Sequence, residues 1–251
     1  MKIIISPAKK MREDTDWLLG TQLPVFLEQT QRLKEILQEK SRDELKKLWA
    51  CNDKITDQNI ERLKAMKPEL AKTPALLAYE GIQYQYMAPE VFHSGQWEYV
   101  QEHLRILSGF YGILRPLDAV VPYRLEMQAK LSDTGADGTG FSDLYDFWGD
   151  SLYRELTSDD CVILNLASKE YGKIIEKYKT PEVRIITCIF GELSDGKVRV
   201  KGTMAKMARG EMVRWLSLHQ INQPEQIFEF QELGYAYAPA YSREDQPVFL
   251  R

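Results

Sequence analysis

Residues 104–131 constrain the fold of this chain most, because they combine residues that fix the backbone with residues that carry charge. An apolar run at 104–107 is followed by Gly109 and Gly112, and glycine suits tight or left-handed turns. Two prolines then exclude a regular helix and a central strand. We therefore expect a loop at a buried edge of the molecule that carries polar side chains.

Charged residues stand in the second half of this stretch, between apolar ones. They are Arg115, Asp118, Arg124, Glu126 and Lys130. In one interpretation the segment is a structural crossover whose charges pair with one another, Arg115 with Asp118 and Arg124 with Glu126. In the other, the charges form a functional site on a positioned loop. The residues alone leave both interpretations open.

Sequence patterns predict an alternation of strands and helices. Three strands, at residues 2–6, 104–107 and 161–166, are expected to share one sheet, and a hairpin is expected around Ser194-Asp195-Gly196. This indicates an α/β (mixed α+β) fold with a central mixed sheet surrounded by helices. No linker or repeat divides the chain, so we expect a single domain over residues 1–251. A further strand is predicted at 73–79, and helices at 23–40, at 41–49 with a capping box from Ser41, from Thr56 onward, and at 96–103, 144–156, 169–179 and 204–219.

Composition limits the class of protein. With 251 residues, 44% of them hydrophobic, the chain can bury a sizeable core. No apolar run approaches the roughly 20 residues that a membrane span needs, and no signal-peptide pattern is present. We therefore expect a cytoplasmic protein without a membrane partner. The cysteines Cys51, Cys161 and Cys188 are isolated, which suits a reducing compartment, and we expect Cys161 and Cys188 to be buried in strands.

The charge distribution permits an anionic partner although the net charge is -4. Residues 1–12 carry four bases and no acid, and residues 197–214 carry six bases against Glu211 alone. Residues 131–160 hold eight acids and one base. Segregation of this kind allows a positive patch on an acidic protein.

Sequence motifs give no sign of a metal, a cofactor or a catalytic nucleophile. HExxH, paired CxxC, GxSxG, the P-loop and GxGxxG are all absent, and the histidines are scattered. We therefore expect no metal site and no cofactor. The segment Gly109-Phe110-Tyr111-Gly112 is similar to the hairpin of a helix-hairpin-helix element, whose backbone amides hold a phosphate.

Several motifs together resemble the YaaA family of peroxide stress-resistance proteins. This resemblance implies a bacterial, cytoplasmic protein of the response to hydroperoxide, which limits oxidative, iron-linked damage. It also implies DNA binding through a positively charged cleft. The chain departs from the family at Gln128, where glycine is usual. The motifs are I-S-P-A-K-K at 5–10, Y-E-G at 79–81, S-G-F-Y-G-I-L-R-P-L-D at 108–118, P-Y-R-L-E-M at 122–127, F-W-G at 147–149, N-L-A-S-K-E-Y at 165–171 and A-K-M-A-R-G at 205–210.

A nucleic-acid interface is the first functional hypothesis. Basic side chains from distant segments would neutralise phosphates in one cleft, and Tyr111 and Tyr123 would stack on exposed bases. The partner would be double- or single-stranded DNA, read with little sequence preference. The residues assigned to this interface are Lys9, Lys10, Gly109, Tyr111, Gly112, Arg115, Tyr123, Arg124, Lys130, Lys169, Lys206 and Arg209.

The alternative is an enzyme that acts on a phosphorylated or nucleotide substrate. The same cations would clamp an anion, and Glu126 or Asp118 would act as general base. A DNA-binding protein needs a long groove, whereas an enzyme needs an enclosed pocket that holds a carboxylate of raised pKa. The absence of a cofactor or nucleophile motif favours binding. A third interpretation is an interaction protein with no ligand.

Overall fold

The computed structural model describes residues 1–16, 18–135 and 140–251. Its central sheet has the strand order β6-β5-β1-β8-β9. Strand β1 (Lys2–Ile5) lies in the middle and pairs in parallel with β5 (Leu104–Ser108) and with β8 (Val162–Asn165). The expectation that these three strands share a sheet is confirmed.

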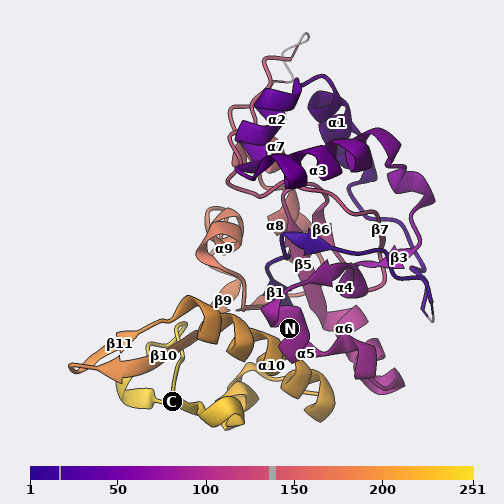
Figure 1. Ribbon diagram of the computed structural model, residues 1–251. Helices are drawn as coiled ribbons and strands as arrows, with labels where there is room; N and C mark the ends of the chain where they lie inside the picture. Colours follow the sequence, from indigo (N-terminus) through magenta and orange to yellow (C-terminus); the bar gives the residue numbers. More distant parts are fainter. Residues whose placement is uncertain (17, 136–139) are drawn as a thin grey trace.

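The central sheet is mixed, as the sequence predicts. Strand β9 (Arg184–Thr187) continues the parallel set beside β8, whereas β6 (Gly112–Leu114) runs antiparallel to β5. Helices flank the sheet (Figure 1). None of the helices in the described ranges is both long and apolar enough to cross a membrane.

A second sheet has the strand order β11-β10-β13-β12. The expected hairpin is confirmed: β10 (Ile189–Ser194) and β11 (Lys197–Arg199) pair antiparallel and project from the body of the molecule (Figure 1). Strands β12 (Ala236–Tyr237) and β13 (Val248–Leu250) complete this sheet. One buried apolar cluster includes residues of both sheets, and the single domain stays a prediction.

Two strand pairs of two residues each complete the β-structure. Strand β2 (Lys10–Met11) pairs with β4 (Tyr79–Glu80), and β3 (Thr73–Pro74) pairs with β7 (Ala119–Val120). The predicted strand at 73–79 is wrong in its middle, where the fully buried helix α4 (Ala75–Ala78) stands. Alanine and leucine favour a helix where burial on all sides does not require alternation.

Helices α1 (Leu27–Gln38), α2 (Arg42–Trp49) and α3 (Asp53–Ala65) form an N-terminal group. The capping box at Ser41 is confirmed. The predicted cap at Thr56 is wrong, because Asn52 accepts the hydrogen bond from the amide of Ile55.

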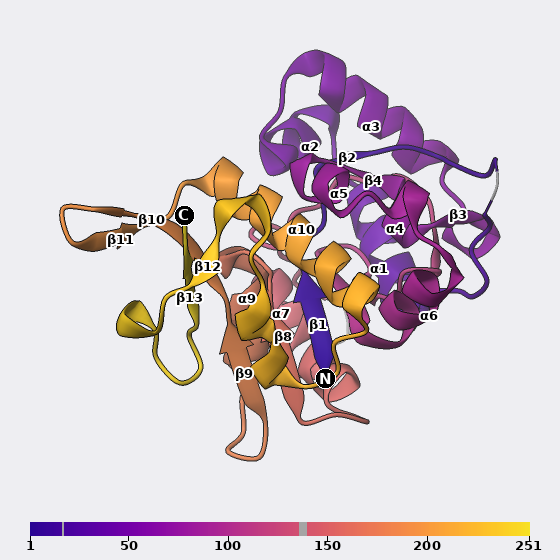
Figure 2. The ribbon, with the colours of Figure 1, turned by 90° about the horizontal axis from the view of Figure 1, so that it is seen from below.

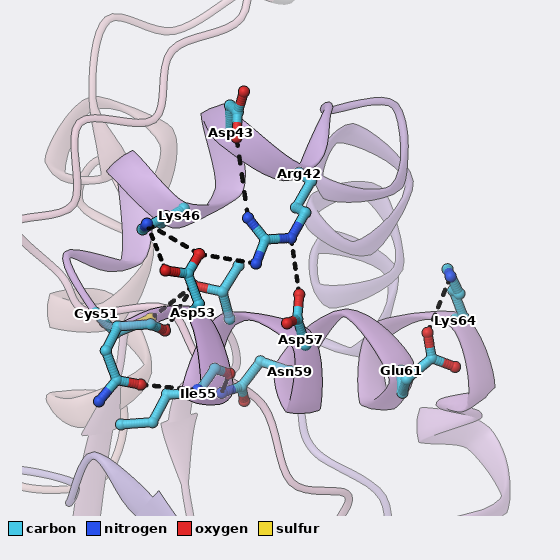
Figure 3. Close-up of polar contacts among 12 residues, drawn as sticks. Arg42, Asp43, Lys46, Cys51, Asp53, Ile55, Asp57, Asn59, Glu61 and Lys64 are labelled. Carbon is cyan, nitrogen blue, oxygen red and sulfur yellow. Dashed lines mark hydrogen bonds and ion pairs between the residues drawn. The ribbon is translucent and has the colours of Figure 1, made fainter.

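An exposed ion-pair network joins α2 to α3 (Figure 3). The guanidinium of Arg42 donates to Asp57 and to Asp53, at 2.8 Å each, and Lys46 also donates to Asp53. The hydrogen bonds to Asp57 and Asp53 raise the pKa of Arg42 further above its ordinary value. This network links the exposed faces of α2 and α3.

The remaining helices follow the prediction with shifted ends. The predicted helix at 144–156 is two helices, because Gly149 has a positive φ of 52° between them. Cys188 is buried as expected, but Cys161 is exposed just before β8, so that expectation is wrong. The α-helices are α5 (Ile82–Met87), α6 (Ser94–His103), α7 (Leu144–Trp148), α8 (Ser151–Leu156), α9 (Lys169–Glu176) and α10 (Gly202–His219), and the 3-10 helices are Pro68–Leu70, Pro89–Val91, Pro224–Glu229, Glu232–Gly234 and Pro239–Tyr241.

Helices α5 and α10 cross in close contact (Figures 1 and 2). This crossing positions residues of the candidate anion-binding site. Gly210 lies against the backbone of Gln83, and a Cβ atom at position 210 would stand 2.0 Å from the Gln83 carbonyl oxygen. Only glycine permits this approach. The crossing therefore places Arg209, the preceding residue, beside the start of α5.

We expect the Gly210→Ala variant to lower the free energy of unfolding by about 1–3 kcal/mol, because the added methyl group forces the two helices apart. This loss would appear although alanine favours a helix over glycine by about 1 kcal/mol. Gly202→Ala, in the same helix with open space around its Cβ atom, is the control and should not destabilise the protein. Urea unfolding of both variants measures the difference, and equal stabilities would contradict the tight crossing.

Candidate anion-binding site

A cavity of about 440 Å³ opens at the carboxyl ends of β1 and β8. Ser6 follows β1 and Ser168 follows β8, and both lie on its wall. The amide of Ser168 donates to the Ser6 hydroxyl at 2.8 Å, and the Tyr84 hydroxyl of α5 donates to the Ser6 carbonyl at 3.0 Å. Open α/β sheets bind ligands outside this edge. We call this cavity the strand-end pocket.

Half of the residues that the sequence assigns to an interface line the strand-end pocket. They come from the segment after β1, from the P-Y-R-L-E-M segment and from α10. Lys169 is exposed on α9, between the wall residues Ser168 and Glu170. The six lining residues are Lys9, Lys10, Tyr123, Arg124, Lys206 and Arg209.

Carboxylates pair with several of these cations. Glu126 binds Lys9 at 2.7 Å and Arg124 at 3.0 Å, so the predicted pairing of Arg124 with Glu126 is confirmed. Glu80 binds Lys10 at 3.0 Å. The Arg124 side chain is 12% exposed, and its Nε atom is buried without a hydrogen-bond partner. This guanidinium therefore keeps one donor that no group of the described chain accepts.

Arg209 differs from the other cations of the pocket. Burial lowers the pKa of its guanidinium, no carboxylate of the described chain pairs with it, and its Nε atom has no hydrogen-bond partner. Gln83, on α5, is only 7% exposed, and its side-chain nitrogen is also buried without a partner. Gln83 could not be predicted as a site residue, because one amide side chain in an aromatic segment gives no pattern that indicates a ligand.

A second cavity, of about 610 Å³, adjoins the first, since Glu126 lines both. The predicted residue Lys130 lies in this second cavity with Lys40 and Lys47. We call the two cavities together the basic groove. Its walls carry eight basic side chains and four carboxylates, on a chain whose net charge is -4.

The structure does not place Gly109, Tyr111 and Gly112 in this groove. They form a buried turn between β5 and β6, so strands rather than helices flank it. The Ser108 hydroxyl accepts the amide hydrogens of Phe110 and Tyr111, which leaves these donors unavailable to a phosphate. The helix-hairpin-helix interpretation of these residues is therefore wrong. Glycine is required at position 109 by packing, because a Cβ atom there would stand 2.7 Å from the Leu125 carbonyl oxygen.

Arg115 and Asp118 also lie outside the basic groove. Arg115 follows β6 and stands near Arg105, at the opposite end of β5 from the strand-end pocket. Its guanidinium pairs with Glu155 at 3.5 Å, and only its backbone amide donates to Asp118, at 2.8 Å. The predicted side-chain pair Arg115–Asp118 is wrong, because the carboxylate accepts a backbone hydrogen in this turn. Asp118 is therefore not a base for a ligand in the pocket.

Glu170 is the carboxylate that the sequence analysis missed. It lines the strand-end pocket, and its Oε1 atom accepts the amide hydrogen of Gln128 at 3.1 Å. Burial raises the pKa of Glu170, and the nearby charge of Glu126 adds to the rise. From the sequence, a glutamate in the first turn of a predicted helix is expected to be exposed to solvent. Only the tertiary fold places it in the wall of the pocket.

Tyr123 forms part of the wall and offers little surface for stacking. It is 7% exposed, and its hydroxyl lies 2.9 Å from that of Tyr79 and 2.7 Å from that of Ser108. Burial raises the pKa of Tyr123 to about 12. Within residues 1–16, 18–135 and 140–251, no group of three or more His, Cys, Asp or Glu side chains could hold a metal ion.

Comparisons with known proteins agree with the sequence motifs. The family model described as "Peroxide stress protein YaaA" matches residues 1–241. A UPF0246 protein of Desulfitobacterium hafniense is 53% identical over 252 residues, which cover 100% of this chain and 98% of that protein. A UPF0246 protein of Agathobacter rectalis is 51% identical over 100% of this chain and 99% of its own.

Asp118 should make stability depend on pH. It is 1% exposed, and burial raises its pKa from 3.8 to about 6. Between these values the folded state binds more protons than the unfolded state, so stability falls as the pH rises, by about 1.4 kcal/mol per pH unit.

We therefore expect the stability of the wild type relative to Asp118→Asn to fall by about 3 kcal/mol between pH 3.5 and pH 7. Asp195→Asn, at an exposed hairpin position, is the control and should show no such trend. Urea unfolding across the pH series measures it. A constant difference between wild type and Asp118→Asn would show that Asp118 ionises normally.

Proposed function

This chain belongs to the YaaA family of peroxide stress proteins, and we propose that it acts in the response to hydroperoxide by binding DNA along the basic groove. The proposal places the protein in the bacterial cytoplasm, where binding would limit oxidative, iron-linked damage to DNA. The DNA is double- or single-stranded and is bound with little sequence preference.

The convergence of cations from distant segments is the observation that carries this proposal. Lysines and arginines that follow β1, that flank P-Y-R-L-E-M and that stand on α10 line one groove of an acidic protein. Exposed lysines along a groove neutralise phosphates and release counterions. Contacts with the DNA backbone carry no base information, hence the slight sequence preference.

Lys206 and Lys130 are the most direct test, because they are exposed and stand in the two different cavities of the groove. Log affinity for duplex DNA should fall linearly with log salt, with a slope of about -0.9 per phosphate contact. Lys206→Ala and Lys130→Ala should each weaken binding similarly for all sequences and flatten that slope by about one. Gel-shift titrations across a salt series measure both effects.

Arg115→Ala is the matched control, since this arginine lies at the other end of β5. It should leave affinity and slope unchanged. Affinity that does not depend on salt, or an equal loss in the Arg115 variant, would contradict the groove as the binding surface.

An enzyme that acts on a phosphorylated or nucleotide substrate is the second candidate. The observation that favours it is the raised pKa of Glu170 inside a pocket lined by cations. Arg124 and Arg209 would clamp the anion, and Glu170 would accept the proton as general base. This carboxylate replaces Glu126 and Asp118 as the expected base, because Glu126 is held by two cations and Asp118 lies elsewhere.

Under this second candidate, Glu170→Gln should abolish turnover while the protein still binds its ligand. The wild-type rate should rise with pH through a pKa above 4.5, because the base acts only when ionised. Release of phosphate from nucleoside triphosphates and from p-nitrophenyl phosphate measures the rate. Glu155→Gln, outside the pocket, is the control, and a wild type without turnover on these probes would reject this candidate.

A further inference from the structure

We propose that Arg209, Gln83 and Arg124 form a recessed site for a single phosphate monoester in the strand-end pocket. A phosphate monoester is the group that the substrate of the second candidate function would present, so the proposal rests on that function. It requires binding only, so its failure can be told apart from the absence of turnover. Its three donor residues differ from the exposed lysines of the basic groove, although Lys9, Lys10 and Lys206 line the same pocket.

Arg209 is partly buried and has no carboxylate partner in the described chain. Desolvation of its charge is therefore not compensated by an opposite charge, and burial lowers the pKa of the guanidinium. Arg209 lines the pocket, so an anion that enters the pocket can supply the missing partner. Planar guanidinium groups match phosphate oxygens with two parallel hydrogen bonds.

Gln83 provides independent support. Its side-chain nitrogen is buried without a partner in a residue that is 7% exposed, and an unsatisfied buried donor costs stability unless a ligand accepts its hydrogen. The helices that carry Gln83 and Arg209 cross at Gly210, and both residues line the pocket. Two side chains from two crossing helices thus each have a donor nitrogen without an acceptor.

Arg124 contributes a third donor from the P-Y-R-L-E-M segment, which also lines the pocket. Its guanidinium binds Glu126 on one side, while its buried Nε atom has no partner. Three donor groups from α5, α10 and the P-Y-R-L-E-M segment suit a phosphate group with three terminal oxygens better than a planar carboxylate with two.

The size of the pocket indicates that the phosphate carries an attached group. A volume of about 440 Å³ lies in the range of small-molecule sites and exceeds the needs of inorganic phosphate. Two sources share this chemistry, a free mononucleotide and the terminal phosphate of a DNA strand. A phosphodiester within an intact duplex does not present three terminal oxygens.

Calorimetric titration of the full chain with adenosine monophosphate, inorganic phosphate and adenosine tests the proposal. The two phosphates should bind and adenosine should not. Arg209→Met and Gln83→Leu should each weaken phosphate binding by about tenfold to a hundredfold, the usual effect of one hydrogen bond to a charged group. Arg214→Met, at an exposed position on the same helix, is the control and should bind as the wild type does.

Thermal unfolding separates a ligand site from a structural role. The free Arg209→Met protein should melt at or above the wild-type temperature, because an apolar side chain of similar volume replaces a partly buried charge without a carboxylate partner. A lower melting temperature together with unchanged phosphate binding would overturn the proposal, as would a wild type that binds neither phosphate.

Oligonucleotides with and without a 5′-phosphate distinguish the two sources. Tighter binding of the phosphorylated strand, lost in Arg209→Met but kept in Arg214→Met, assigns the site to DNA ends. Equal binding of both strands, with adenosine monophosphate still bound, assigns it to free nucleotides. Both results support the phosphate site, and neither depends on salt-sensitive binding along the groove.

Discussion

The pairing of β1 with β5 and β8 is the constraint on which the rest of the structure depends. All four residues of β1 are buried, so the strand can lie only in the centre of the sheet. Its position fixes where the chain leaves the sheet at Ser6, and the hydrogen bond from Ser168 ties that exit to the neighbouring strand β8. The segment that carries Lys9 and Lys10 thus begins at a point that is held in place by the sheet.

Carboxylates distribute the positive charge of the pocket unevenly. Glu126 and Glu80 bind the lysines near the rim, whereas Arg209 on α10 has no such partner within the described chain. The lysines near the rim are therefore partly neutralised, whereas Arg209 is not. A single small anion would find its strongest attraction at the α5–α10 wall, while an extended polyanion would meet lysines along the whole groove.

Local sequence patterns predicted the central strands well, because continuous β-branched and apolar runs such as β1 fit few other structures. Charge distribution and the family motifs gave six of the pocket residues, from the segment after β1, from P-Y-R-L-E-M and from α10. The prediction failed at Gly109, because glycine is used both in phosphate-binding hairpins and where the backbone packs closely. Gly109 lies in a turn between strands, where there is no room for a Cβ atom. Gln83 and Glu170 could not be predicted, because their properties arise only from tertiary packing. Packing leaves the side-chain nitrogen of Gln83 without a hydrogen-bond partner and partly removes Glu170 from water.

The contact between Gly210 and Gln83 gives the pocket one stiff side and one adaptable side. Two helix backbones touch there, and no rotation of a side chain can relieve a backbone contact. The exposed side chain of Lys9 also lines the pocket, and a long exposed side chain can change rotamer. The helix crossing thus sets the position of the Gln83 backbone, whereas adjustment to the outline of a bound molecule falls to exposed side chains such as Lys9.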